Sequence, residues 1–201
     1  MSVDSTQSSL LSRVRDPANH EAWVQFDGKY RELIVRYCRA RGLQPTDAED
    51  VRQLVMMSLS KALPGFRYRP ELGRFRDYLG RAVRNAVNKR FSRPGRSGEL
   101  LYTDQLDLPS EAEAEAADEA WDREWMLHHY RQAMASVRRD FESKSIEVFE
   151  GLLAGRPVVE LAAAFGLSEQ AVHKIKQRIR NRLRELIAAQ IHEEEFPERQ
   201  P

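Results

Sequence analysis

The chain has 201 residues, of which 41% are hydrophobic and 31% charged, and its 32 Lys and Arg nearly balance 31 Asp and Glu. No stretch approaches the roughly 18 consecutive apolar residues of a membrane-spanning helix, and MSVDSTQSSLL at the start lacks the basic and apolar segments of a secretory signal. The single cysteine, Cys38, excludes an intramolecular disulfide and a cysteine-rich zinc site. We therefore expect a cytoplasmic globular protein.

The near-neutral total hides a strong segregation of charge along the chain. Residues 67–96 contain ten basic and two acidic side chains, a net charge of +8. Residues 97–124 contain one basic and ten acidic side chains, a net charge of −9, and residues 168–187 return to +4. Two basic units on either side of an acidic bridge predict two separate contacts with one polyanion, joined by a segment that avoids it.

Apolar side chains recur at helical spacing in the first part of the chain, and strands are poorly supported. A stripe from Trp23 to Tyr37 predicts a helix that ends before Gly42, and Asp16-Pro17 suits its N-terminus. This part of the chain is thus predicted to be helical from its first apolar stripe onward.

Two further helices are predicted before the acidic bridge. Thr46 followed by Glu49 is a capping-box pattern, and the helix that it opens ends at Pro64-Gly65. Another helix begins at Phe75 and carries arginine and asparagine on the faces that are not apolar. We expect residues 1–95 to form a small helical domain with one very basic helix.

The acidic bridge begins with the break SRPGRSGE at residues 92–99. Its alanine-rich run, residues 111–120, suits a helix extension or a flexible linker, and we place an acidic flexible linker at residues 96–120. Trp121 and Trp125 open the helical pattern of a second domain, residues 121–190, and residues 191–201 form a polar tail. The fold class is therefore all-α, with two small helical domains joined by an acidic linker.

The sharpest local pattern is a helix-turn-helix at residues 157–186. Gly166 suits the left-handed position of the turn, and Ser168 can cap the second helix. In this motif the start of the second helix enters the major groove of DNA. A helical hairpin with a solvated basic face is the structural alternative. The side chains expected to reach DNA are Ser168, Glu169, Gln170, His173, Lys174, Lys176, Gln177 and Arg178.

A second pattern, FRYRPELGRFRDYLGRAVRNAVNKRF at residues 66–91, interleaves basic and aromatic side chains. Such a mixture suits a separated nucleic-acid strand, because arginine holds phosphates while flat rings receive unstacked bases. A core helix with buried aromatic side chains explains the pattern equally well. If the segment binds DNA, its contacts are Tyr68, Arg74, Arg76, Tyr78, Arg81, Arg84, Asn85, Asn88 and Lys89.

The basic, aromatic-rich segment and the helix-turn-helix, in this order and separation along the chain, resemble the RNA polymerase sigma factors of the extracytoplasmic-function type. DAEDVxQ at residues 47–53 is similar to the polymerase-binding helix of that family, and GxFRxYL at residues 73–79 with Arg84-Asn85 resembles its segment for promoter melting and −10 reading. Residues 157–186 resemble its −35-reading helix-turn-helix. Leu54 stands where the family usually has an acidic residue, and Tyr78 where it has tryptophan.

The resemblance implies a promoter-specificity subunit that binds core RNA polymerase and promoter DNA and needs no cofactor. The residues that it places on the polymerase are Asp47, Glu49, Asp50, Arg52, Gln53, Met56 and Met57. Asp47 and Glu49 also suit a helix N-terminus through the helix dipole, and Met56 and Met57 also suit core packing. The sequence leaves open whether an anti-sigma factor binds the protein.

The sequence offers no catalytic or metal site. It has neither a nucleotide-binding glycine loop with its lysine nor an HExxH motif, so we do not expect an enzyme. The rival interpretation is a stand-alone helix-turn-helix regulator, which needs a dimer to bind two DNA half-sites. A third is a polymerase- or RNA-associated adaptor without promoter selectivity.

Overall fold

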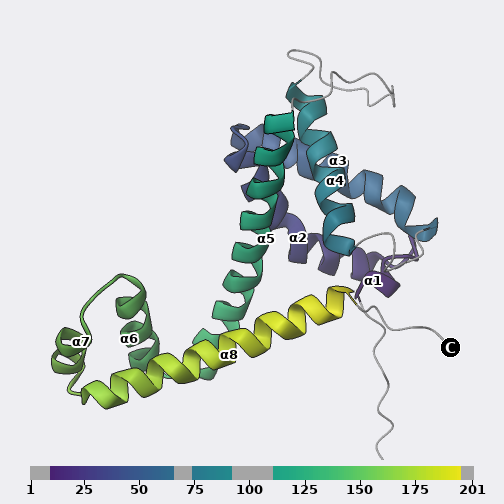
Figure 1. Ribbon diagram of the computed structural model, residues 1–201. Helices are drawn as coiled ribbons and strands as arrows, with labels where there is room; N and C mark the ends of the chain where they lie inside the picture. The colour runs from purple at the N-terminus through teal and green to yellow at the C-terminus, as the bar shows by residue number, and fades with distance from the viewer. Residues whose placement is uncertain (1–9, 66–73, 92–110, 196–201) are drawn as a thin grey trace, which may run out of the picture. The chain divides into compact units, whose positions relative to one another are not determined.

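The computed structural model describes residues 10–65, 74–91 and 111–195 (Figure 1). They form eight α-helices and one short 3-10 helix, and no strand occurs among them, which confirms the predicted all-α class. The chain divides into two compact units: residues 1–126 with 193–201, and residues 127–192. Each unit has a hydrophobic core of its own.

Apart from the end of α8 (Glu169–Glu195) from Glu193 onward, the N-terminal unit is built from five elements and the first part of a sixth. These are α1 (Leu10–Arg13), α2 (His20–Ala40), α3 (Pro45–Ala62), the 3-10 helix η1 (Leu63–Gly65), α4 (Phe75–Phe91) and the beginning of α5 (Glu111–Asp140). The apolar stripe of α2 is buried, and Phe26 and Tyr30 contact Phe75 of α4 through their rings. On α4, the buried side chains are four residues apart, so one face of this basic helix is fixed against the core.

Two of the predicted helix starts are wrong. The N-cap of α2 is Asn19, whose side chain accepts a hydrogen bond from the Ala22 backbone N–H at 3.0 Å. The helix α3 starts two residues earlier than the capping-box pattern indicates, with Pro45 in its first turn and no side-chain cap. The reason is that Pro45 has a backbone angle already suited to a first helical turn, and the Glu49 side chain is bound to arginines instead.

The expected linker and tail also differ from the structure. Within the described part of the bridge, residues 111–120 are helical and belong to α5, and the ring of Trp121 lies in the core of the N-terminal unit together with Trp125. The alanine-rich run favours helix, and the two indoles anchor it. At the other end, residues 191–195 continue α8 because no glycine or proline interrupts the chain between Ser168 and Pro197.

The second unit consists of four helical segments. They are the later part of α5, α6 (Ser143–Leu153), α7 (Val158–Phe165) and α8 (Glu169–Glu195) as far as His192. Val137 of α5, Phe149 of α6 and Ile179 of α8 belong to one buried cluster. Val148, Ala162 and Val172 form a smaller cluster that joins α6, α7 and α8. The helices α7 and α8 are the predicted helix-turn-helix.

Candidate nucleic-acid interface

The side chain of Asp77 caps the beginning of α4. Arg74 precedes the helix, and its carbonyl oxygen accepts the backbone N–H of Asp77 at 3.0 Å. In return, the Asp77 carboxylate accepts the backbone N–H of Arg74 at 3.2 Å. The Asp77 side chain thus supplies one half of a capping box, and a backbone hydrogen bond takes the place of the other half. It fixes the position at which the basic helix starts.

The face of α4 opposite its core stripe carries cationic and amide side chains. Arg74, Arg81, Asn85 and Asn88 are spaced by seven, four and three residues, so they share one face of the helix. Arg74, Arg81 and Asn85 are exposed, and Asn88 is half-buried. This face combines groups that hold phosphates with amides that can hydrogen-bond base edges. It is the part of the predicted −10 set that the fold presents outward.

The aromatic members of the predicted set have different surroundings. Tyr78 is half-buried and packs against the core cluster, and Lys89 is half-buried as well. Both flank the outward face of α4 on the same side. Tyr68 lies outside the described residues. The core therefore packs against one side of Tyr78, while the rest of this residue remains accessible to solvent.

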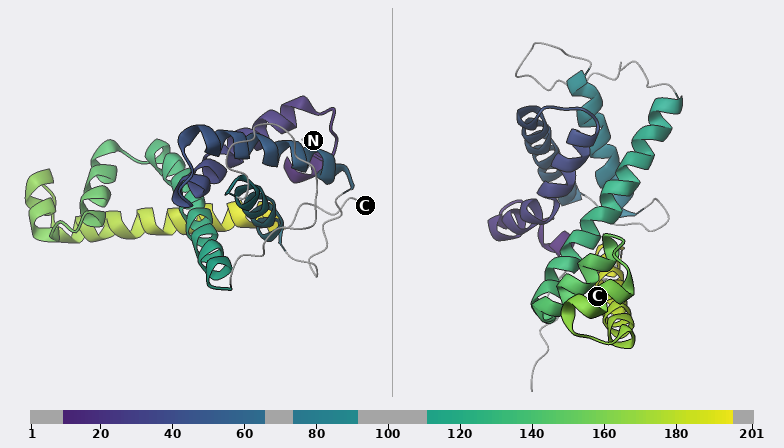
Figure 2. Two further views of the ribbon diagram at one scale, coloured as in Figure 1. Left: turned by 90° about the horizontal axis from the view of Figure 1, so that it is seen from above. Right: turned by 90° about the vertical axis from the view of Figure 1, so that its left-hand side faces the viewer.

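Two arginines of the predicted set point to another side of α4 and have partners on α5. Arg84 Nη1 lies 3.0 Å from Asp118 Oδ1, and Arg76 forms an ion pair with Asp122. Figure 2 shows α4 and the beginning of α5 side by side. Asp118 and Asp122 are not among the predicted site residues, although the neighbouring blocks of opposite charge are a signal for such pairing.

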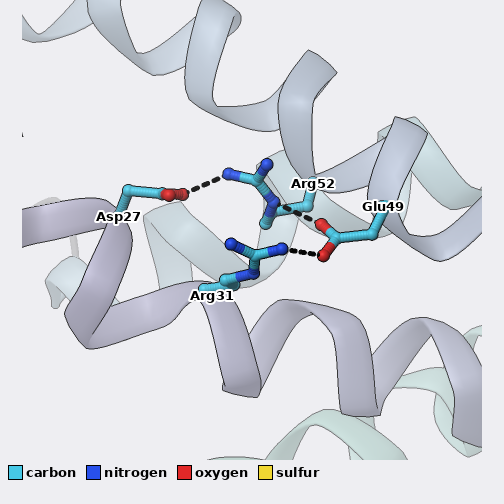
Figure 3. A network of polar contacts seen from close by, with 4 residues as sticks. All are labelled: Asp27, Arg31, Glu49 and Arg52. Atoms are coloured by element: carbon cyan, nitrogen blue, oxygen red, sulfur yellow. Dashed lines mark hydrogen bonds and ion pairs between the residues drawn. The ribbon is translucent and has the colours of Figure 1, made fainter. Parts of the chain in front are cut away.

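Three members of the predicted polymerase set are engaged within the fold. Figure 3 shows a network in which Arg52 of α3 donates to Asp27 of α2 and to Glu49, while Arg31 also donates to Glu49. Hydrogen bonds from Arg52 and Arg31 hold the pKa of Glu49 below its usual value. The Arg52 side chain is only 12% exposed. The network therefore joins α2 to α3.

Asp47 is the third engaged residue, and the remaining four divide into inward and outward positions. An Asp47 carboxylate oxygen lies 2.7 Å from Arg90 Nη2, which joins α3 to α4. Met56 is half-buried and packs against the core. Asp50, Gln53 and Met57 are exposed, and their spacing of three and four residues places them on one face of α3.

The turn between α7 and α8 has the predicted geometry. Gly166 adopts φ 60° and ψ 44°, the left-handed conformation, and the Leu167 N–H donates to the Ala162 carbonyl at 2.9 Å. The Ser168 hydroxyl accepts the Ala171 N–H at 3.1 Å and so caps α8. The inward side chains Val172 and Ile179 are buried. The turn thus sets which face of α8 remains accessible.

All eight side chains predicted to reach DNA from the helix-turn-helix are exposed. Gln170, Lys174 and Gln177 lie on the face opposite the buried stripe, at spacings of four and three. His173 lies beside this centre, whereas Lys176 and Arg178 flank the helix on opposite sides. The Arg178 guanidinium lies 5.6 Å from the Phe141 ring centroid, a cation–π contact that orients it.

The described residues contain no group of three or more side chains suited to bind a metal ion. Cys38 is completely buried, and burial raises the pKa of its thiol to about 12. The described helices include none that is long and apolar enough to cross a membrane. The chemistry of the described surface is thus that of charged, amide and aromatic side chains.

Comparison with known proteins finds a family similarity in the N-terminal part of the chain. The family model described as Sigma-70 region 2 matches residues 28–97, a range that includes α3 and α4. No curated protein matches the chain. A solved structure, "Structure of CnrH in complex with the cytosolic domain of CnrY", is 22% identical and covers 90% of this chain and 96% of that chain, but its TM-score of 0.35 establishes no common arrangement. Residues 28–97 are therefore similar to the sigma-70 region 2 family.

Proposed function

We propose that this protein is an RNA polymerase sigma factor of the extracytoplasmic-function type. It binds core polymerase, recognises the −10 and −35 promoter elements and helps to open the DNA. The observation that carries the proposal is the sigma-70 region 2 match over residues 28–97, which contains the basic helix α4. Such a protein transfers no chemical group, and it acts in the cytoplasm, where polymerase and promoter DNA are.

The α4 helix would contact the −10 element. Arg74 and Arg81 on its outward face would hold backbone phosphates, and Asn85 and Asn88 would hydrogen-bond base edges. Tyr78, supported by the core, would stack on a base as the duplex opens. Unstacking a base costs a few kcal/mol, which stacking and hydrogen bonds on the protein offset.

The exposed face of α3 would bind core polymerase. Asp50, Gln53 and Met57 would form the contact, with Met57 as its apolar centre because this side chain is 56% exposed. Asp47, Glu49, Arg52 and Met56 belong to the same segment, but three of them tie α3 to its neighbours and Met56 packs on the core. We assign those four a positioning role.

The α8 helix would contact the −35 element from the major groove. Gln170, Lys174 and Gln177, with His173 beside them, would face base edges from the centre of the exposed surface. Lys176 and Arg178 would reach phosphates on either side of the groove. Ser168 and Glu169 stand at the start of the helix, where the groove is entered.

The first experiment is a pull-down with bacterial core RNA polymerase, followed by transcription from a promoter library. Stable binding with selection of a two-part promoter is the expected result. Failure to bind polymerase, together with tight dimeric binding to a palindromic site, would refute the sigma proposal and support a stand-alone regulator. Because the library contains many candidate promoters, selection from it also reveals which sequence the protein prefers.

A matched pair of variants tests the α3 surface within the same assay. Met57→Ala removes an exposed apolar side chain from the proposed contact, whereas Val24→Ala removes a similarly exposed one, 58% against 56%, from α2. We expect Met57→Ala to weaken polymerase binding by about 1 kcal/mol or more, as truncation of a residue at the centre of an interface does. Val24→Ala should leave it unchanged. Equal effects of the two variants would remove Met57 from the interface.

A further inference from the structure

The beginning of α5 presents two adjacent stripes to the N-terminal unit. Ala117, Trp121 and Trp125 are buried and four residues apart, so they form one apolar stripe along the helix. Asp118 and Asp122, each one residue further on, form an acidic stripe beside it. The apolar stripe fixes the helix to the core, and the acidic stripe is thereby held at a defined place along α4.

The acidic stripe meets two arginines of the basic helix. Asp118 pairs with Arg84 at 3.0 Å, and Asp122 pairs with Arg76. Arg76 and Arg84 lie two turns apart on α4, and Gly80 stands midway between them. A Cβ at Gly80 would lie 2.6 Å from Nε1 of Trp121, so the indole occupies the space between the two ion pairs. The contact therefore spans more than two turns of α4.

The anchors and the ion pairs differ in strength. Trp121 and Trp125 are 2% and 4% exposed, and large aromatic side chains dominate burial energetics. The carboxylates are open to water, since Asp118 is 63% and Asp122 65% exposed. Ion pairs with this much exposure are weak and screened by salt. A phosphate can therefore replace either carboxylate on its arginine while the indoles keep α5 in place.

We propose that the acidic stripe of α5 is an internal competitor of nucleic acid for the basic helix α4. Asp118 and Asp122 occupy Arg84 and Arg76 in the free chain and weaken its hold on a DNA backbone. Binding of a strand exchanges the two carboxylates for two phosphates. This inference rests on the proposed function in one respect, namely that α4 contacts promoter DNA.

The test measures binding of the full chain to a short fluorescein-labelled single-stranded DNA by anisotropy, over a range of salt concentrations. Asp118→Asn with Asp122→Asn removes both competitors and retains the side-chain size. Glu115→Gln with Glu119→Gln is the matched control, because both residues are exposed on the same helix and form no ion pair with any described residue. Both double variants change the net charge equally.

The expected result is about three- to tenfold tighter binding for the aspartate variant than for the glutamate control. Both variants contact the same phosphates once bound, but the control must first break the two ion pairs, and salt screens that cost. The aspartate variant should therefore show the steeper slope of log K against log salt, with a difference of at most about 0.7 for each arginine on single strands. Equal affinities and equal slopes in the two variants would overturn the inference.

A double-mutant cycle on one pair separates competition from general electrostatics. Asp118→Asn should tighten binding in the parent chain but not in an Arg84→Gln background, because the arginine that it releases is then absent. A gain that persists without Arg84 would also overturn the inference. Circular dichroism of each variant verifies that the helices are retained.

The two proposals fail in different ways. If polymerase binding and promoter selection hold while the aspartate variant matches the glutamate control, only the competitor is refuted. If polymerase does not bind while the aspartate variant still gains affinity through Arg84, only the sigma function is refuted. The anisotropy assay uses no polymerase, so its outcome does not depend on the transcription result.

Discussion

Gly80→Ala tests the packing of α5 on α4 at its closest point. The added Cβ would lie 2.6 Å from Nε1, 2.8 Å from Cε2 and 3.0 Å from Cδ1 of Trp121. Favourable heavy-atom contacts lie at about 3.5 Å or more, so the ring or the helix must move by about 1 Å. Overpacking of this kind costs about 1–3 kcal/mol. Alanine in place of glycine inside a helix returns about 1 kcal/mol. We therefore expect a net loss of about 1 kcal/mol in the free energy of unfolding.

The assay is urea unfolding followed by tryptophan fluorescence. All three tryptophans, Trp23, Trp121 and Trp125, belong to the N-terminal unit, so the signal reports this unit alone. With a urea m-value of about 1–3 kcal/mol/M, a loss of about 1 kcal/mol lowers the midpoint by about 0.3–1 M. This shift is large enough to resolve in replicate curves.

The control is the same substitution in a Trp121→Phe background. Phenylalanine lacks the indole nitrogen that the new Cβ would meet, so Gly80→Ala should be neutral or stabilising there by up to about 1 kcal/mol. The difference between the two backgrounds isolates the contact from the helix propensity of alanine. A stabilisation of about 1 kcal/mol in both backgrounds would show that Trp121 does not lie over Gly80.

Four further predictions concern single side chains. Hydrogen bonds with arginine lower the pKa of Glu49 in the folded state. The stability that Glu49 contributes should therefore be fully present above about pH 4.3 and be lost as the pH falls through the lowered pKa. Glu49→Gln should flatten this loss in urea midpoints measured between about pH 6 and 3. Cys38, with a pKa raised to about 12 by burial, should react with a thiol reagent at neutral pH only after denaturation, and rapid reaction of the native chain would contradict its burial. Lys174→Ala should weaken binding to the selected −35 element by about 1–3 kcal/mol and relax specificity. Arg178→Ala should weaken binding to all DNA sequences alike and reduce the slope of log K against log salt by about 0.9. Identical specificity and salt dependence in the two variants would refute the different placement of Lys174 and Arg178 on α8.

Much of the fold follows from short-range patterns in the sequence. The helical periodicity predicts α2, α3, α4, α8 and the part of α5 from Trp121 onward, and Pro64-Gly65 marks the end of α3 correctly. Gly166 and Ser168 determine the helix-turn-helix, because a left-handed turn residue and a hydroxyl cap act within a few residues of chain. The exposed face of α8 follows from the same spacing, since its inward positions recur every three or four residues.

Only the tertiary structure decided which charged side chains remain available to bind another molecule and which are paired within the fold. A carboxylate or a guanidinium has the same appearance in the sequence whether it faces water or a partner, and the partners here are far apart along the chain: Glu49 with Arg31, Asp47 with Arg90, Arg84 with Asp118. The charges of the acidic run predict a solvated linker. The spacing of Ala117, Trp121 and Trp125 places it on the core instead, because burial of two indoles outweighs the tendency of its carboxylates to remain in water.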